Sequence, residues 1–231
     1  MQHYINQGLI RRNRTLGRWM MFGGLGASLV AVVISFTAPQ YIFIALGLML
    51  VGGLVSQVGT AMYNRFGRSP RIDEVIDHSL KGLDDQYAVF HYLLGAKHVL
   101  LTPAGALAII PRVERGEISN ENGRWLHEPP KRRISLGSRK RELRDLVPET
   151  QRAVRQLGRS LTRHLPDHEP VHVDALVMFL ADDAQLETGE GSLLAAHRKK
   201  VKGLLRTLPR KAALTAAEIR SLAARLTRKR S

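Results

Sequence analysis

Clustered lysines and arginines are the side chains of this sequence whose type and spacing suit a definite chemistry, namely contact with phosphate groups. One cluster lies between residues 131 and 144, and a second extends from Arg198 to Arg230, where twelve lysines and arginines accompany a single acid. Clustered cations contact phosphates in a salt-sensitive, sequence-independent way. The first cluster, which we expect to bind a polyanion, comprises Lys131, Arg132, Arg133, Arg139, Lys140, Arg141 and Arg144. Few aromatic residues interrupt these segments, which argues against base stacking on single strands.

A basic surface of this kind could bind either of two polyanions, or it could simply be solvated. The chain carries 35 lysines and arginines against 20 acids, a formal net charge of +15. A charge of this sign attracts polyanions and says little about fold. Nucleic acid and anionic lipid are both candidates. Each lysine or arginine near an anionic inner leaflet contributes about 1 kcal/mol of binding free energy. Purely solvated cations are the alternative.

The residues that usually form metal or nucleophile sites are absent or poorly spaced. The sequence has no cysteine, which excludes disulfides, thiolate zinc sites and cysteine nucleophiles. Of its nine histidines, His164 and His168 are four residues apart but straddle Pro166, so they do not share a helix face. The loop at residues 189–192 has no phosphate-cradle pattern. We therefore expect neither a metal nor a cofactor.

Two apolar runs near the N-terminus have the length of membrane spans. They cover residues 19–38 and 41–62, and only Pro39 and Gln40 separate them. About 20 apolar residues cross a bilayer core, so both runs qualify, and the short link requires an antiparallel hairpin. A cleaved signal peptide has a shorter apolar stretch and no second span. A buried soluble hairpin would hardly extend over 44 residues without a charge.

Flanking charge predicts the orientation of this hairpin. Arg11, Arg12, Arg14 and Arg18 precede the first run, arginines again follow the second, and the turn has none. The positive-inside rule therefore places both termini and the rest of the chain on the cytoplasmic side of the inner membrane. Small residues recur every fourth position, which favours close helix pairing. These are Gly23, Ala27, Ala31 and Ser35 in the first run and Gly52, Ser56 and Thr60 in the second.

The remaining chain predicts an α/β domain. Residues 1–18 form a basic N-terminus, 63–71 a basic linker, and 72–231 the domain with basic C-terminal helices. Apolar spacing predicts a short helix from Ile72, and strands follow over residues 87–94, 97–102 and 106–110. The domain continues with a hairpin around residues 120–123 and a helix over 148–165. It ends with a central strand over 171–180 and a last helix opened by Thr215 and Glu218. This order predicts an α/β sandwich around a small mixed sheet.

The order of elements and several local motifs resemble the nuclease-related domain (NERD) family, a branch of the PD-(D/E)xK nuclease-like fold. The resemblance covers about residues 72–226. It rests on Asp73-Glu-Val-Ile76-Asp-His-Ser-Leu80, on Lys97-His98-Val99 to Gly105 and Ile109, on Gly116-Glu117-Ile118 with Trp125, on Pro148-Glu-Thr-Gln151, and on Leu176–Phe179. Members of this fold cleave phosphodiesters with Mg²⁺ held by carboxylates and a lysine near the attacking water.

The resemblance implies an active site that this sequence does not complete. At the family's Asp position stands Lys97, and at its Glu-x-Lys positions stand Ile110 and Arg112. Only Asp73 keeps an acid. Asp77 and Glu114 could replace the missing ligands, but solvated surface acids are the simpler explanation for them. Lys97 and Arg112 could also form an ion pair with Asp73 or hold a phosphate without cleaving it.

Three functions remain open at this point. The preferred one is a non-catalytic, membrane-anchored nuclease-like domain that binds a polyanion or acts as a scaffold at the cytoplasmic face. The second is an accessory subunit of a larger membrane complex, which would contact its partner subunits through the hairpin. An active nuclease with a rearranged metal site ranks third.

Overall fold

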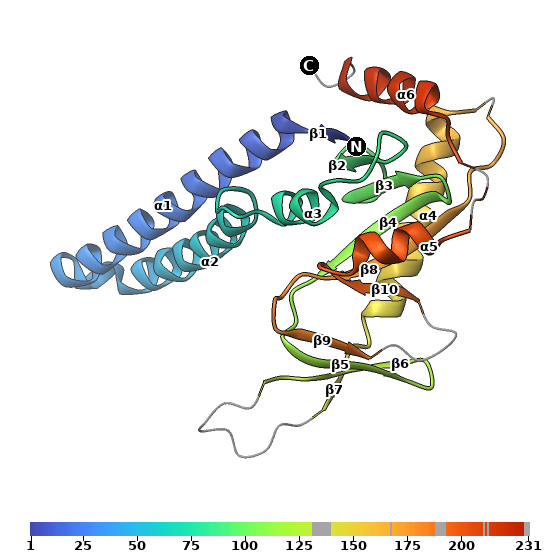
Figure 1. Ribbon diagram of the computed structural model, residues 1–231. Coiled ribbons are helices and arrows are strands. Elements are labelled where there is room, and N and C mark those ends of the chain that lie inside the picture. The colour runs from blue at the N-terminus through green and yellow to red at the C-terminus, as the bar shows by residue number, and fades with distance from the viewer. Residues whose placement is uncertain (131–139, 167, 188–192, 210, 212, 229–231) are drawn as a thin grey trace. The chain divides into compact units, whose positions relative to one another are not determined.

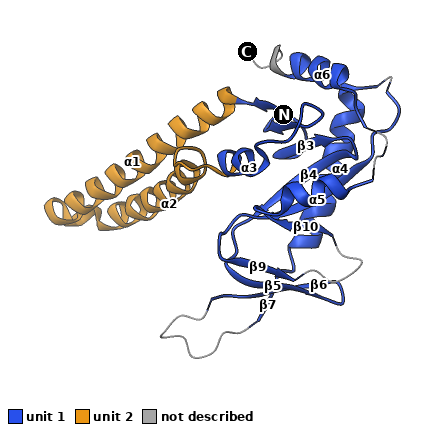
Figure 2. Cartoon of the chain, in the orientation of Figure 1, with its two compact units in different colours: residues 1–6, 73–231 blue, residues 7–72 orange. Residues whose placement is uncertain are grey.

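The computed structural model describes residues 1–130, 140–166, 168–187, 193–209, 211 and 213–228. The chain divides into two compact units (Figure 2). One unit is a helical hairpin of residues 7–72, and the other is an α/β unit of residues 1–6 and 73–231. The prediction of a mixed α/β protein with two long apolar N-terminal helices is confirmed.

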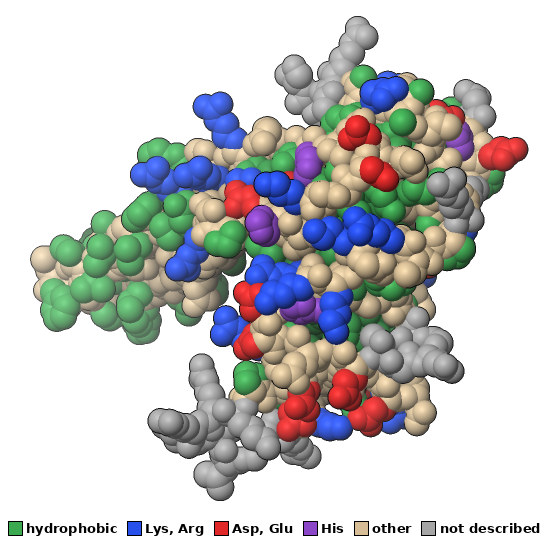
Figure 3. Space-filling view, viewed as in Figure 1, with side chains coloured by type: hydrophobic (Ala, Val, Ile, Leu, Met, Phe, Trp, Pro, Cys, Tyr) green, Lys and Arg blue, Asp and Glu red, His purple; other side chains and the backbone are tan. Residues whose placement is uncertain are grey.

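The hairpin unit consists of two helices joined by a short turn. Helix α1 spans Gln7–Thr37, the 3-10 turn η1 spans Pro39–Tyr41, and α2 spans Ile42–Phe66. Both helices are long and apolar enough to cross a membrane. Helix α1 begins twelve residues before the predicted span, because the arginine-rich segment ahead of Trp19 is also a good helix former. Apolar side chains cover the outside of both helices (Figure 3).

Glycines on the two helices make the close contact of the hairpin. The buried positions recur every seven residues, at Ile10, Gly17, Gly24 and Ala31 in α1 and at Ala45, Gly52, Gly59 and Phe66 in α2. A Cβ on Gly24 would lie 2.5 Å from the Gly52 carbonyl oxygen, and Ser56 Oγ donates to the Met21 carbonyl at 3.1 Å. The predicted stripe on α1 was wrong in part, since a Cβ on Gly23 would meet open space. A seven-residue period is typical of antiparallel helices that pack at a shallow angle.

A six-stranded mixed sheet forms the centre of the α/β unit (Figure 1). Its strand order is β1-β2-β3-β4-β8-β10. The strands are β1 Gln2–Ile5, β2 Ala88–His91, β3 His98–Thr102, β4 Gly105–Arg112, β8 Val173–Phe179 and β10 Leu194–His197. Strands β2, β3 and β4 form an antiparallel meander, whereas β4, β8 and β10 run parallel. The largely apolar sequences of β2, β3 and β4 are buried on both faces, as a sheet between two helical layers requires.

Helices cover both faces of this sheet (Figure 1). They are α3 Ile72–Leu80, α4 Leu146–His164, α5 Val201–Thr207 and α6 Ala216–Arg228. The apolar sides of α4 and α6 share one core with Phe90, Ala108 and Phe179 of the sheet. Helix α3 lies on the opposite face, where Asp77 contacts His91 of β2. Lys202 of α5 donates to a backbone carbonyl at the end of α3, which places α5 beside it.

A second, four-stranded sheet extends from one end of the first, in the order β7-β6-β5-β9. Its strands are β5 Gly116–Glu121, β6 Arg124–Glu128, β7 Arg141–Glu142 and β9 Ala184–Glu187. The hairpin of β5 and β6 confirms the prediction around residues 120–123. Trp125 packs 6.3 Å from Phe179 between ring centres, so the second sheet adds to the same core.

Candidate functional site

A chain of hydrogen-bonded histidines and one aspartate is the main polar cluster on the α3 face of the sheet. Asp77 Oδ1 accepts from His91 Nε2 at 3.0 Å and from His3 Nδ1 at 2.9 Å. His91 Nδ1 in turn lies 2.8 Å from His98 Nδ1. The rings of His91 and His98 are fully buried, and Tyr92 packs edge-on against His98.

The hydrogen-bond geometry assigns the protons in this chain. A carboxylate only accepts hydrogen bonds, so His91 Nε2 and His3 Nδ1 must each carry a hydrogen. In a neutral His91 ring Nδ1 is then the acceptor, and His98 Nδ1 donates to it. Burial by itself raises the pKa of Asp77, but the hydrogen bonds from His91 and His3 outweigh it and hold the pKa below its ordinary value. Asp77 is therefore a charged anchor for two imidazoles.

Four elements distant in sequence position these side chains. His3 lies on β1, which pairs parallel to β2 with His3 beside Val89. Antiparallel pairing of β2 and β3 sets His91 directly opposite His98. Asp77 points to them from α3, one turn after the buried Asp73. Chemically, the chain can relay a proton between imidazoles, and structurally it ties the N-terminal strand to the first domain helix.

The positions implied by the nuclease resemblance do not share one face of the sheet. Asp73 is buried on α3, on the same side as Asp77. Ile110 has the strand parity of Ala108, whose side chain packs in the core beneath α4. Arg112 points to that same α4 face. Lys97 is exposed and directly precedes β3, opposite Ile110 if the β3–β4 register is continued.

Arg112 is surrounded by three carboxylates, two at the start of α4 and one just after β4. Its side chain, 12% exposed, lies 3.0 Å from Asp145 Oδ2, 3.0 Å from Glu149 Oε2 and 3.6 Å from Glu114 Oε1. The predicted partner Asp73 is not among these three acids. One guanidinium among three carboxylates leaves a local excess of negative charge. Such a cluster suits the bracing of β4 against α4 better than the binding of a phosphate.

The predicted polyanion cluster is described only in its last part. Lys131, Arg132, Arg133 and Arg139 lie outside the described residues. Lys140 donates to Glu121 at 2.9 Å, an interaction that raises the pKa of Lys140, and Arg144 donates to Glu142 at 2.9 Å. Arg141 belongs to β7. Lys140 and Arg144 are thus each bound to a carboxylate of the domain itself.

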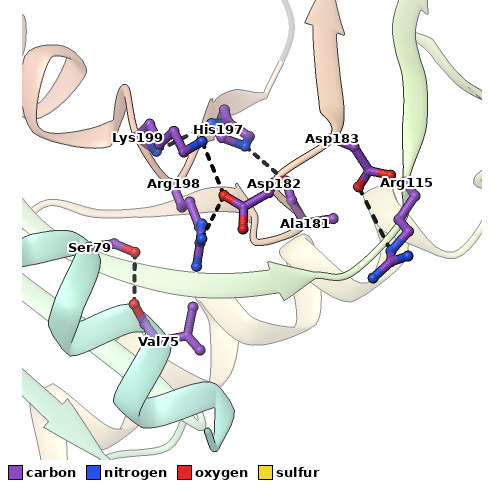
Figure 4. A network of polar contacts seen from close by, with 9 residues as sticks. All are labelled: Val75, Ser79, Arg115, Ala181, Asp182, Asp183, His197, Arg198 and Lys199. Carbon is purple, nitrogen blue, oxygen red and sulfur yellow. Dashed lines mark hydrogen bonds and ion pairs between the residues drawn. The ribbon is translucent and has the colours of Figure 1, made fainter.

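The cations that begin the C-terminal cluster are paired in the same way (Figure 4). Arg198 and Lys199 both approach Asp182, at 2.6 Å and 3.1 Å, and hydrogen bonds from these two cations lower the pKa of Asp182. His197 Nε2 donates to the Ala181 carbonyl at 2.9 Å, which fixes the turn between β8 and β9. These contacts connect β10 to that turn.

Sequence reasoning missed a row of arginines on α4. Arg152, Arg155, Arg159 and Arg163 are all exposed, while Leu157 and Leu161 of the same helix are buried. The signal was present in the sequence, because spacings of three, four and four residues align side chains on one face of a helix. The row is less conspicuous in the sequence than the dense charge runs at residues 131–144 and 198–230.

Within the described part of the chain, no group of three or more histidine or acidic side chains could hold a metal ion. No protein-family model matches this chain, and no match emerges from curated proteins or solved structures.

Proposed function

We propose that this protein is a membrane-anchored, non-catalytic α/β domain of nuclease-like ancestry that binds a polyanion at the cytoplasmic face. The hairpin of α1 and α2 inserts into the bilayer and holds the domain there. The domain presents cations to its partner without cleaving it.

The surface of the hairpin supports insertion and is the observation that carries the proposal. Large apolar side chains remain exposed along both helices, for example Phe36 at 81%, Phe43 at 84% and Leu50 at 65%. A soluble protein rarely exposes such a continuous apolar surface. The contacts between the helices are made instead by glycines and serine hydroxyls, which is typical of membrane helices.

The connectivity supports an orientation with both helix ends on one side. The chain leaves the α/β unit after Asn6 and returns to it at Asp73. A hairpin that begins and ends in one folded domain must have both of its open ends on the side of that domain. The arginines at the open ends of the hairpin, on the first turns of α1 and at and after the end of α2, favour the cytoplasmic side.

Two features support a domain without nuclease chemistry. The chain order is α3, β2, β3, β4, the second-sheet strands β5 to β7, α4 and β8, with β4 parallel to β8, and this order supports the proposed nuclease-like ancestry. The implied metal ligands are replaced by Lys97 and Ile110, and Asp73 lies on the other face of the sheet from Ile110. Magnesium needs several oxygen ligands at one point, which this arrangement does not offer.

Two measurements on the full chain test the proposal, the first in isolated membranes and the second on the purified protein. We expect the protein to stay in the membrane pellet after washes with carbonate and high salt, and to leave it only with detergent. We also expect no cleavage of duplex or single-stranded DNA or RNA with Mg²⁺ or Mn²⁺. Release by salt alone would contradict the anchor, and cleavage abolished by Asp73→Ala would contradict the non-catalytic domain.

A further inference from the structure

The exposed face of α4 carries four arginines in a straight row, Arg152, Arg155, Arg159 and Arg163, which we call the arginine row. The opposite side of α4 is buried through Ala153, Leu157 and Leu161. The last arginine lies eleven positions after the first, so the row is about 16 Å long at 1.5 Å per residue. The core fixes which way the helix faces, and the row therefore points outward as one unit.

Among the described residues, none of the four arginines forms an ion pair or a side-chain hydrogen bond. Other cations of the domain do form them, as Arg112, Lys140 and Arg198 show. Equal charges one turn apart destabilise a helix. The stability of α4 therefore does not explain why the row exists, and an external anion is a physical reason for it.

The surroundings of the row favour a nucleic acid over a lipid surface. Its exposed neighbours Gln151, Gln156 and Thr162 are neutral hydrogen-bonding side chains of the kind that contact phosphates and sugars. An interfacial membrane helix needs exposed apolar side chains to enter the acyl boundary. Among the described residues, Val113 is the only large hydrophobic side chain exposed on the α/β unit, and it is not on α4.

We propose that the arginine row binds the phosphodiester backbone of double-stranded nucleic acid; this inference rests on the proposed polyanion-binding function. Arginine binds phosphate through two parallel hydrogen bonds, which lysine cannot do. A duplex presents one phosphate per about 3.4 Å of its axis on each strand, so a row of about 16 Å is long enough to reach several phosphates of one strand. Neither α4 nor α6 contains a phenylalanine, tyrosine or tryptophan on which bases could stack, so this face contacts the backbone and does not read sequence. Arg220 and Arg225 of α6, exposed over the same face of the sheet, add two further cations.

The test measures binding of a labelled duplex DNA of arbitrary sequence to the full chain in phosphatidylcholine nanodiscs, at several salt concentrations. The row variant combines Arg152→Gln, Arg155→Gln, Arg159→Gln and Arg163→Gln, because glutamine keeps the helix propensity. The control variant combines Arg68→Gln, Lys81→Gln, Arg115→Gln and Arg124→Gln, which removes the same charge from exposed positions outside α4 and outside both predicted basic clusters. Far-ultraviolet circular dichroism checks that both variants are folded. A second row variant with lysine at all four positions keeps the charge and covers the case in which the glutamine variant fails to fold.

We expect the row variant to bind at least about tenfold more weakly, and the slope of log K against log salt to fall by about 3 to 4, since each lost phosphate contact removes about 0.9. The control variant should change affinity less than about threefold. The lysine variant should keep most of the slope and lose affinity.

The other outcomes separate this inference from the proposed function. If the wild-type chain binds duplex but the row variant keeps its salt slope, or the control loses as much, the inference is overturned and the function stands. The inference is likewise overturned, and the function stands, if the wild-type chain binds vesicles that contain phosphatidylserine but does not bind duplex. It is also overturned if the row variant loses binding to these vesicles but keeps its binding to duplex. If the wild-type chain binds neither duplex nor such vesicles, polyanion binding itself fails.

Discussion

Asp77 on α3 accepts a hydrogen bond from the fully buried His91 on β2 at 3.0 Å, and this contact anchors the first domain helix to the sheet. The same carboxylate oxygen holds His3 on β1. In chain order β1 comes before α1 and α3 comes after α2, so this carboxylate joins two segments of the α/β unit that are more than 70 residues apart in sequence. Asp77 thus holds the N-terminal strand and the first domain helix together.

Asp77→Asn should destabilise the α/β unit in a pH-dependent way. Losing charged hydrogen bonds to two imidazoles should lower the free energy of unfolding by about 1–2 kcal/mol at neutral pH. The folded-state pKa of Asp77 lies below the ordinary value of 3.8. The advantage of the wild type is therefore fully present above about pH 4 and declines as the pH falls through that lowered pKa.

Thermal unfolding followed by the fluorescence of the buried Trp125 checks this, in a background with Trp19→Phe. Glu187→Gln, at an exposed carboxylate of β9, is the control and should change the melting temperature little. A wild-type advantage that persists undiminished well below the lowered pKa would contradict the role assigned to Asp77.

Gly52→Leu should disrupt the pairing of α1 with α2. A Cβ at Gly52 would lie 2.7 Å from the Gly24 carbonyl oxygen, so a larger side chain must push the helices apart. At the neighbouring Gly53 a Cβ would meet nothing within 4 Å, so Gly53→Leu is a matched control.

Disulfide cross-linking between the two helices measures the effect. Ser28 Oγ lies 3.3 Å from the Met49 carbonyl, and Ser28→Cys with Met49→Cys reports proximity through disulfide formation in this cysteine-free chain. The yield should fall several-fold with Gly52→Leu and stay unchanged with Gly53→Leu; equal yields would refute the observed contact.

Arg112→Gln should weaken the attachment of β4 to α4. The substitution leaves Asp145, Glu149 and Glu114 close together without their cation. We expect a loss of about 1–2 kcal/mol, reduced from the value for buried pairs because two of the acids are largely exposed. Arg144→Gln removes an 86% exposed arginine that pairs with Glu142 and should cost little. Denaturant unfolding measures both, and equal effects would show that Arg112 is an ordinary surface cation.

Much of the domain could be predicted from local sequence, because its central elements carry strong patterns. The meander of β2, β3 and β4, the hairpin at residues 120–123 and the helix now assigned as α4 were predicted within a few residues. The capping box of α6 is also confirmed, since Thr215 and Glu218 bond each other reciprocally. These features depend on neighbours in the chain, which a periodic or capping signal can report.

The remaining features depend on partners far along the chain. Strand β1 has four residues and pairs with a strand more than 80 residues later, so nothing local marks it. The contact between His91 and His98 appears only once the β2–β3 register is known. The seven-residue glycine pattern was present in the sequence, but small residues every fourth position obscured it.

The anchoring of the domain by the hairpin is tested most directly by labelling single cysteines in intact cells. Gln40→Cys lies in the turn of the hairpin and Ser221→Cys lies exposed on α6, in a chain with no other cysteine. With a membrane-impermeant maleimide applied to spheroplasts, we predict that Gln40→Cys is labelled from outside and Ser221→Cys only after lysis. Labelling of both cysteines or of neither in intact spheroplasts, or the reverse pattern, would contradict a hairpin that spans the membrane with its domain inside.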